Sequence, residues 1–139
     1  MVEKNNKTDL IANEQLLRQL LEEEKIELFR EQFLAIHPYD RAQFYEIIGA
    51  KQRQILYRFL SPGEMADVFE ALELEDDEYE GFLSEMDTSY GAAMLSFMYT
   101  DDAVDVLNEL DENQRESYLE MMDVETVQEI NELLAYPEY

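Results

Sequence analysis

The sequence has no cysteine, a single histidine, four glycines and three prolines among its 139 residues. Without cysteine there is no disulfide framework and no thiolate zinc site, and an intracellular location is compatible with this composition. Few glycines and prolines argue against a fold of strands and tight turns, and 46% hydrophobic residues argue against disorder. Because no run of about 18 apolar residues occurs, we expect no membrane-spanning helix. Met1–Leu10 lacks the apolar segment of a signal peptide.

The residues and motifs of the common catalytic sites are equally scarce. With one histidine, no cysteine and no glycine-rich turn, nucleophilic triads, HExxH zinc sites and phosphate-binding loops are all absent. His37 directly precedes Pro38 at a predicted helix start, which favours a capping or packing role over catalysis. Paired carboxylates can act as acid and base, but the sequence shows no pocket around them. We therefore expect a protein that is not an enzyme.

Positive charge is missing from one half of the chain. Residues 1–60 hold 10 acids and 9 bases, whereas residues 61–139 hold 24 acids and one base, Arg115, within a net charge of −24. Such a field repels nucleic acid and attracts cations or basic partners. A solubilising surface is the simpler interpretation. However, this half is also regularly apolar, so it should fold despite self-repulsion, and we expect cations to take part in its function.

An apolar pattern repeats every twelve residues from His37 onward. The eighth, ninth and twelfth positions of each unit are apolar, with Asn131 the clear exception. The units are 37–48, 49–60, 61–72, 75–86, 87–98, 99–110, 111–122 and 123–134, with a two-residue insert after residue 72. Twelve residues make one short helix and a minimal connection. We therefore predict eight helices in this frame and at least one helix before His37.

The apolar frame also predicts the core of the domain. Tyrosine, phenylalanine and methionine fall in it often, so we interpret them as core and not as a ligand site. The frame residues expected to be buried are Phe44, Leu56, Val68, Phe69, Leu83, Leu95, Val106 and Leu107, and the frame aromatics and methionines expected in the core include Tyr45, Tyr57, Met86, Met94 and Tyr118.

The predicted helices have recognisable start signals. Pro38 and Pro62 suit a first turn, and Asp87, Asp111 and Asp123 suit N-caps. We expect residues 100–102 to cap the helix of the unit Tyr99–Leu110. Helices this short are unstable alone. We therefore predict an all-α array with consecutive helices packed antiparallel and curling into a superhelix.

Two charged segments interrupt the helical pattern. Residues 22–25 mark either a break between two helices or a solvated turn within one, and the sequence leaves this open. Glu73–Glu80 contains the insert and has acids but neither the alternating ligands nor the central glycine of a calcium loop. We interpret it as a charged turn between helices.

Four aspartates are candidate metal ligands: Asp67, Asp101, Asp102 and Asp105. Asp67 and Asp105 share the seventh position of their units, each beside an apolar residue, and Asp101 and Asp105 lie one helical turn apart. Mg²⁺ takes oxygen ligands and often uses one or two carboxylates while keeping several waters. Such half-sites become useful when another domain supplies further oxygens. Plain surface charge is the alternative.

At these residues the chain resembles the N-terminal cytosolic domain of the MgtE family of magnesium channels. The resemblance covers roughly Lys25–Tyr139 and leaves residues 1–24 as a leader, disordered at first and then helical. Its matching pieces are HPYDRA (37–42), SPGEMADVFEAL (61–72), TDDAVDVLNELDENQRE (100–116) and LLAYPEY (133–139). The last stretch leads, in that family, into a pair of CBS modules and then a transmembrane pore domain, which this chain does not include.

The resemblance implies a right-handed, armadillo-like superhelix that senses Mg²⁺ on the cytoplasmic side of the membrane, within a full-length homodimer. In the family, ions bridge the acidic face of this domain to the CBS modules at high intracellular magnesium, and the compact assembly closes the pore. Asp67, Asp101 and Asp105 match acidic positions associated with the bridging ions, and Asp102 lies beside them. A different class stays open, namely a helical adaptor whose acidic groove binds a basic peptide.

Overall fold

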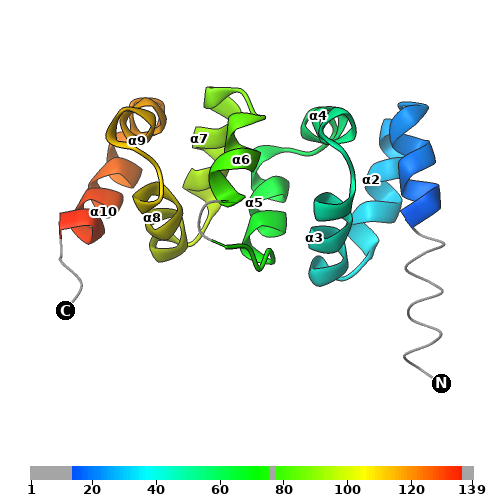
Figure 1. The fold of residues 1–139 in the computed structure, drawn as a ribbon, viewed down its shortest axis with the longest axis horizontal. Coiled ribbons are helices and arrows are strands. Elements are labelled where there is room, and N and C mark those ends of the chain that lie inside the picture. Colours follow the sequence, from blue (N-terminus) through cyan, green and yellow to red (C-terminus); the bar gives the residue numbers. More distant parts are fainter. Residues whose placement is uncertain (1–13, 76–77, 136–139) are drawn as a thin grey trace, which may run out of the picture. The chain divides into compact units, whose positions relative to one another are not determined.

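All regular structure in the described part of the chain is helical. The computed structural model describes residues 14–75 and 78–135, and the first helix spans residues 14–22 in that range. The helices that follow are α2 (Ile26–Ala35), α3 (Pro38–Ile47), α4 (Ala50–Phe59), α5 (Pro62–Glu70), α6 (Glu78–Ser84), α7 (Thr88–Phe97), α8 (Thr100–Asn108), α9 (Glu112–Leu119) and α10 (Val124–Ala135) (Figure 1). The all-α prediction is therefore confirmed. Across the described ranges, no helix is both long and apolar enough to cross a bilayer.

The predicted twelve-residue frame is confirmed, because each of its eight units holds one of the helices α3–α10, and only α10 extends past its unit, by one residue. The eight frame residues predicted to be buried are all buried, and so are the frame aromatics and methionines assigned to the core. Asn131, the polar exception, is exposed. Two helices precede His37, as expected. The repeat in the sequence is thus a repeat of one helix and one connection.

The chain divides into two compact units, Met1–Ser61 and Pro62–Tyr139. Aromatic side chains from three helices fill the core of the first unit. The rings of Phe29 and Phe33 on α2 stack at 5.1 Å, and Phe44 of α3 and Phe59 of α4 lie 6.3 and 5.8 Å from Phe29. Aromatic pairs at such spacings add to the stabilisation that comes from burial alone.

Alternate helices approach most closely in the second unit. The nearest backbones are those of α5 and α7, of α7 and α9, and of α8 and α10, which lie side by side in Figure 1. We predicted that consecutive helices would pair. Among the consecutive pairs of the second unit, α7 and α8 come closest, but less close than these alternate pairs. The connection between α7 and α8 is two residues long, and its first residue, Met98, has an extended backbone.

Gly91 allows one of these close approaches. A Cβ atom at this position would lie 2.9 Å from Cε1 of Tyr118, a separation that real Cβ atoms essentially never show. The ring of Tyr118, which comes from α9, therefore packs directly on the backbone of α7. Gly91 is buried, and its missing side chain sets the distance between the two helices.

Most predicted helix starts are confirmed. Nδ1 of His37 accepts a hydrogen bond from the backbone N–H of Tyr39 at 3.1 Å, so the single histidine is an N-cap. Asp111 and Asp123 accept hydrogen bonds at 2.8 Å from backbone N–H groups three residues on. Asp87 occupies the N-cap position of α7, but its side chain makes no capping hydrogen bond. The predicted start of α7 at Asp87 is therefore confirmed, but the predicted capping by its side chain was wrong.

Arginines at the fifth position of the repeat stabilise the end of the preceding helix. Their guanidinium groups donate to backbone carbonyls in the last turn of that helix or just after it. Arg41 donates to Leu34 and Ile36, Arg53 to Ile48, and Arg115 to Leu107 and Leu110. Arg115, the single base of residues 61–139, thus stabilises the C-terminal end of α8.

The segment at residues 22–25 is a break between two helices, which answers the question that the sequence left open. Glu24 has a φ of 53°, in the left-handed region, and the chain turns there before α2 begins. After α5, residues 72–75 are irregular, and α6 starts at Glu78. The last three residues of Glu73–Glu80 are therefore helical and not part of the predicted turn.

The buried seam of α8 gives a direct test of the frame. Leu107 is fully buried, and removal of its side chain to Cβ leaves a cavity, so Leu107→Ala should lower the free energy of unfolding by about 2–5 kcal/mol. Leu133→Ala, at a position that is 41% exposed, is the matched control and should cost much less. Equal losses in chemical denaturation would show that the frame is misplaced in α8.

Candidate functional site

The acidic side chains of α8 follow from the helical period of its sequence. Ala103, Val104, Val106 and Leu107 are buried, which turns Asp101 and Asp105 to the outside, where both are exposed. Asp102 is half-buried. Two carboxylates one turn apart on an exposed face repel each other and favour a cation between or beside them.

The fourth candidate, Asp67, lies on α5 between the buried residues Ala66 and Val68 and is exposed. It precedes Glu70 by three residues, so the two carboxylates share one face of α5. Glu70 in turn reaches α8, as its contact with Tyr99 shows. Asp102, Asp105 and Glu70 line a common pocket, whereas Asp67 and Asp101 do not line it.

Glu70 caps α8 from another helix. Tyr99 is the N-cap residue of α8 and supplies no side-chain hydrogen bond, and its backbone N–H donates to Oε2 of Glu70 at 2.7 Å. A carboxylate at this end of a helix also suits the helix dipole. We predicted that residues 100–102 would cap α8. That prediction was wrong because these residues already lie inside the first turn.

Glu70 shares its surroundings with other carboxylates. The pKa of Glu70 is raised to about 7. Burial is the largest cause, and the hydrogen bond to Asp102 and the negative charges of Asp102 and Asp101 act in the same direction. The N–H of Tyr99 acts in the opposite direction on this pKa but does not outweigh the rest. At neutral pH this carboxyl therefore exchanges a proton, which partly relieves the repulsion around the start of α8.

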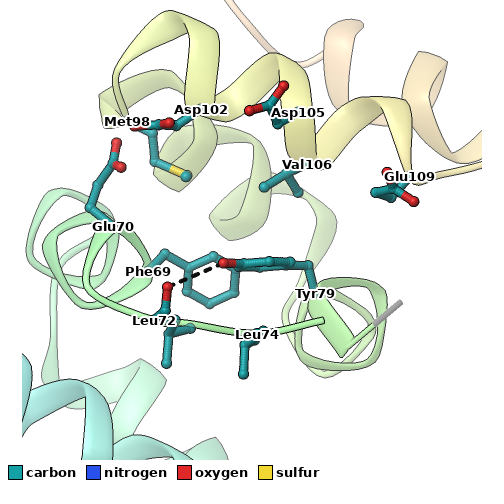
Figure 2. A pocket seen from close by; sticks show the side chains of 10 residues that line it. All are labelled: Phe69, Glu70, Leu72, Leu74, Tyr79, Met98, Asp102, Asp105, Val106 and Glu109. Atoms are coloured by element: carbon teal, nitrogen blue, oxygen red, sulfur yellow. Dashed lines mark hydrogen bonds between the residues drawn. The ribbon is translucent and has the colours of Figure 1, made fainter. Parts of the chain in front are cut away.

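The pocket next to Glu70 has a volume of about 270 Å³. Its lining comes from α5, the following irregular segment, α6, α7's C-cap and α8 (Figure 2). Figure 2 shows the carboxylates along one side and the rings of Phe69 and Tyr79 on the other. The residues that line it are Phe69, Glu70, Leu72, Leu74, Tyr79, Met98, Asp102, Asp105, Val106 and Glu109.

The candidate aspartates do not form a closed metal site by themselves. Among the residues that the structure describes, no group of three or more histidine, cysteine, aspartate or glutamate side chains is arranged to hold a metal ion. Carboxylate oxygens are nevertheless the ligands that Mg²⁺ prefers. The nearest base in sequence to α8, Arg115, is engaged with the carbonyls of Leu107 and Leu110 at 3.1 and 3.2 Å. The face can therefore offer a partial coordination shell only.

The comparisons with known proteins agree on one family. Residues 36–139 match the sequence profile described as the MgtE intracellular N domain. Over 77 residues, or 55% of this chain, the sequence is 46% identical to the magnesium transporter MgtE of Enterococcus faecalis (strain ATCC 700802 / V583), and that match covers 17% of the relative. The crystal structure of the soluble part of a magnesium transporter is similar with a TM-score of 0.88 and 43% identity, over 93% of this chain and 50% of that one. The chain thus spans a minor part of the curated transporter it matches.

The raised pKa of Glu70 predicts a pH dependence of stability. A carboxyl whose folded-state pKa of about 7 exceeds its ordinary 4.5 stabilises the fold fully below about pH 4.5, and this contribution is lost as the pH rises through 7. Because Glu70 is partly exposed, we expect about 1 kcal/mol or less. Unfolding at pH 5 and pH 8 should show higher stability at pH 5.

Glu70→Gln should flatten this pH dependence, since glutamine keeps an acceptor for Tyr99 and loses the titration. Glu73→Gln, at an exposed position in the next segment, is the control and should keep the parent slope. If the stability of Glu70→Gln changes with pH as much as that of the parent, the pH dependence comes from other carboxylates.

Proposed function

Because this chain belongs to the MgtE intracellular N domain family, we propose that it is the magnesium-sensing domain of a magnesium transporter. Two similarities support the proposal, one to a curated magnesium transporter and one to the soluble part of another. We further propose that it works on the cytoplasmic side of the membrane, joined to CBS modules and a pore domain. The transport step itself belongs to the parts of the protein outside this chain.

The sensing role is supported by the carboxylates of α8, which can supply part of a coordination shell for Mg²⁺. Asp101, Asp102 and Asp105 lie within the first two turns of one helix, and Asp101 and Asp105 are exposed. Mg²⁺ binds through one or two carboxylates and keeps several waters, so this face suits a hydrated ion that a second domain also contacts. Alone, it should bind Mg²⁺ weakly, with a dissociation constant of about 10⁻⁴–10⁻³ M.

The mechanism follows from charge. Without Mg²⁺ an acidic face repels an acidic partner surface, and the separated arrangement is favoured. With Mg²⁺ the ion binds the docked arrangement better, because only there do both domains supply oxygens. A ligand shifts such an equilibrium by its difference in affinity for the two states, so several bridging ions make the response steep. Docking at high intracellular Mg²⁺ favours the closed pore.

Asp67 and Glu70 extend the same surface onto α5. Asp67 is exposed one turn before Glu70, whose carboxyl contacts the start of α8. We propose that Asp67 supplies an oxygen to a second bridging ion. Glu70 instead holds the two helices together, and its proton adjusts the charge that the bridging ions meet.

Removal of two charges from α8 tests the proposal. In the full-length transporter, Asp101→Asn with Asp105→Asn keeps side-chain size and removes two carboxylates. Protection of the following linker from protease should then require an Mg²⁺ concentration that is higher by about threefold or more, since each ion loses part of its shell.

The matched control is Glu112→Gln with Glu116→Gln, which removes two exposed charges at the same spacing from α9. It should leave the Mg²⁺ midpoint close to that of the parent. If both double variants shift the midpoint equally, the response reports net charge and not a site on α8. If neither shifts it, Asp101 and Asp105 are ordinary surface charge.

A further inference from the structure

Two aromatic side chains flank the start of α8 and are open to solvent. Phe97, the last residue of α7, is 67% exposed, and Tyr99, the N-cap residue of α8, is 74% exposed. In the described part of the chain they are two of the three most exposed large apolar side chains. Single apolar residues are common on protein surfaces, but two aromatic rings close together on an otherwise acidic unit indicate an interaction surface.

The backbone that carries both rings is held in place. The residue between them, Met98, is buried, and the N–H of Tyr99 donates to Glu70 at 2.7 Å. The ring of Phe97 also lies against α5, where a Cβ atom on Gly63 would be 3.6–3.7 Å from three of its atoms. The exposed aromatic surface is therefore presented by a fixed backbone, and little conformational freedom is lost when a partner covers it.

Charge limits what can cover this surface. Residues 61–139 contain 24 acids and one base, and Asp101 follows Tyr99 by two residues. Such a field repels nucleic acid and anionic membrane surfaces. A second copy of the chain would bring two strongly acidic units together. The occupant that fits is a protein surface with an apolar patch opposite the rings.

The small size of the surface indicates that this protein surface is tethered to the chain. A buried aromatic side chain covers about 150–250 Å², so two rings and their partner together bury about 1,000 Å² at most. Stable interfaces between separate proteins bury about 1,200–2,000 Å². A domain of the same chain needs less, because its tether gives a high effective concentration. The soluble transporter part that this chain matches is about twice as long, since the match covers 50% of it, and it therefore contains further chain.

We propose that Phe97 and Tyr99 form a metal-independent anchor of the docked state, packed against an apolar patch on the following domain of the full-length transporter. This anchor rests on the proposed magnesium function, because it belongs to the same docking. Bridging ions remove the repulsion between the two domains, and the rings add a contact that needs no ion. Both rings adjoin the helix of Asp101 and Asp105, so the anchor and the ions share one interface.

Loss of the anchor should change the Mg²⁺ midpoint of docking but not the number of bridging ions. If docking becomes tenfold weaker and two ions share this loss, the midpoint rises by about threefold. The steepness of the response should stay that of the parent, because every carboxylate ligand is still present.

Protease protection of the following linker, titrated with Mg²⁺ in the full-length transporter, tests the anchor. Phe97→Ser with Tyr99→Ser should raise the midpoint by this factor and still reach full protection at saturating Mg²⁺, which shows that the domain is folded. Phe97→Leu with Tyr99→Leu keeps apolar surface and should stay close to the parent midpoint. The matched control is Met121→Ser with Val124→Ser, at positions 58% and 72% exposed in the same unit, and should leave the midpoint unchanged.

The anchor is excluded if the double serine variant keeps the parent midpoint, or if the control at Met121 and Val124 shifts as far. A double leucine variant that behaves like the serine variant would also overturn it, because the contact would then not be apolar. If the double serine variant shows no protection at any Mg²⁺ concentration, Tyr99→Ser alone decides by the same criteria.

Failure of the magnesium proposal gives a different result. If the parent shows no Mg²⁺-dependent protection, the docked state is absent and the anchor falls with it. If Asp101→Asn with Asp105→Asn leaves the midpoint unchanged while the double serine variant raises it, the ligand assignment is wrong and the anchor stands.

Discussion

Burial of one apolar seam is the interaction on which the rest of this structure depends. Helices of seven to twelve residues are not stable alone in water, so each must bury its eighth, ninth and twelfth repeat positions against other helices. In the second unit this burial also has to outweigh the repulsion among 24 acidic residues. The seam fixes which side chains face outward, and the outward ones are carboxylates. The same repeat therefore determines both which residues are buried and where the surface carboxylates lie.

The second unit does not balance its negative charge with bases of its own. Its single base, Arg115, donates to the carbonyls of Leu107 and Leu110 and so completes a helix end. A carboxyl that shares a proton, Glu70, holds the start of the same helix at 2.7 Å from the N–H of Tyr99. The helix that carries Asp101, Asp102 and Asp105 is therefore fixed at both ends by polar groups from other segments. These contacts fix the position of the three aspartates on α8.

The sequence predicted what depends on local periodicity and missed what depends on packing. The eight helices of the repeat and their buried positions follow from the twelve-residue frame, and the acidic face of α8 follows from the same frame. Glu70 was missed because it contacts the N-cap of a helix, Tyr99, that lies 29 residues further on, and only the approach of α5 to α8 creates that contact. The pocket was missed because the insert at Glu73 and Leu74 indicates a turn but not what surrounds it. The arginines at the fifth position were visible in the sequence, since Arg41, Arg53 and Arg115 recur in register.

We propose that Mg²⁺, and not ionic strength, brings the acidic face to its partner domain. Because the chain has no cysteine, a single Ser117→Cys substitution at an exposed position of α9, in the same unit as α8, can carry one dye, with the second dye on the following domain of the full-length transporter. Energy transfer should rise steeply with millimolar Mg²⁺ and stay low in NaCl of equal ionic strength, because monovalent ions screen charge without bridging two sets of carboxylates. Equal transfer in the two salts would contradict the account and reduce the acidic face to a screened surface.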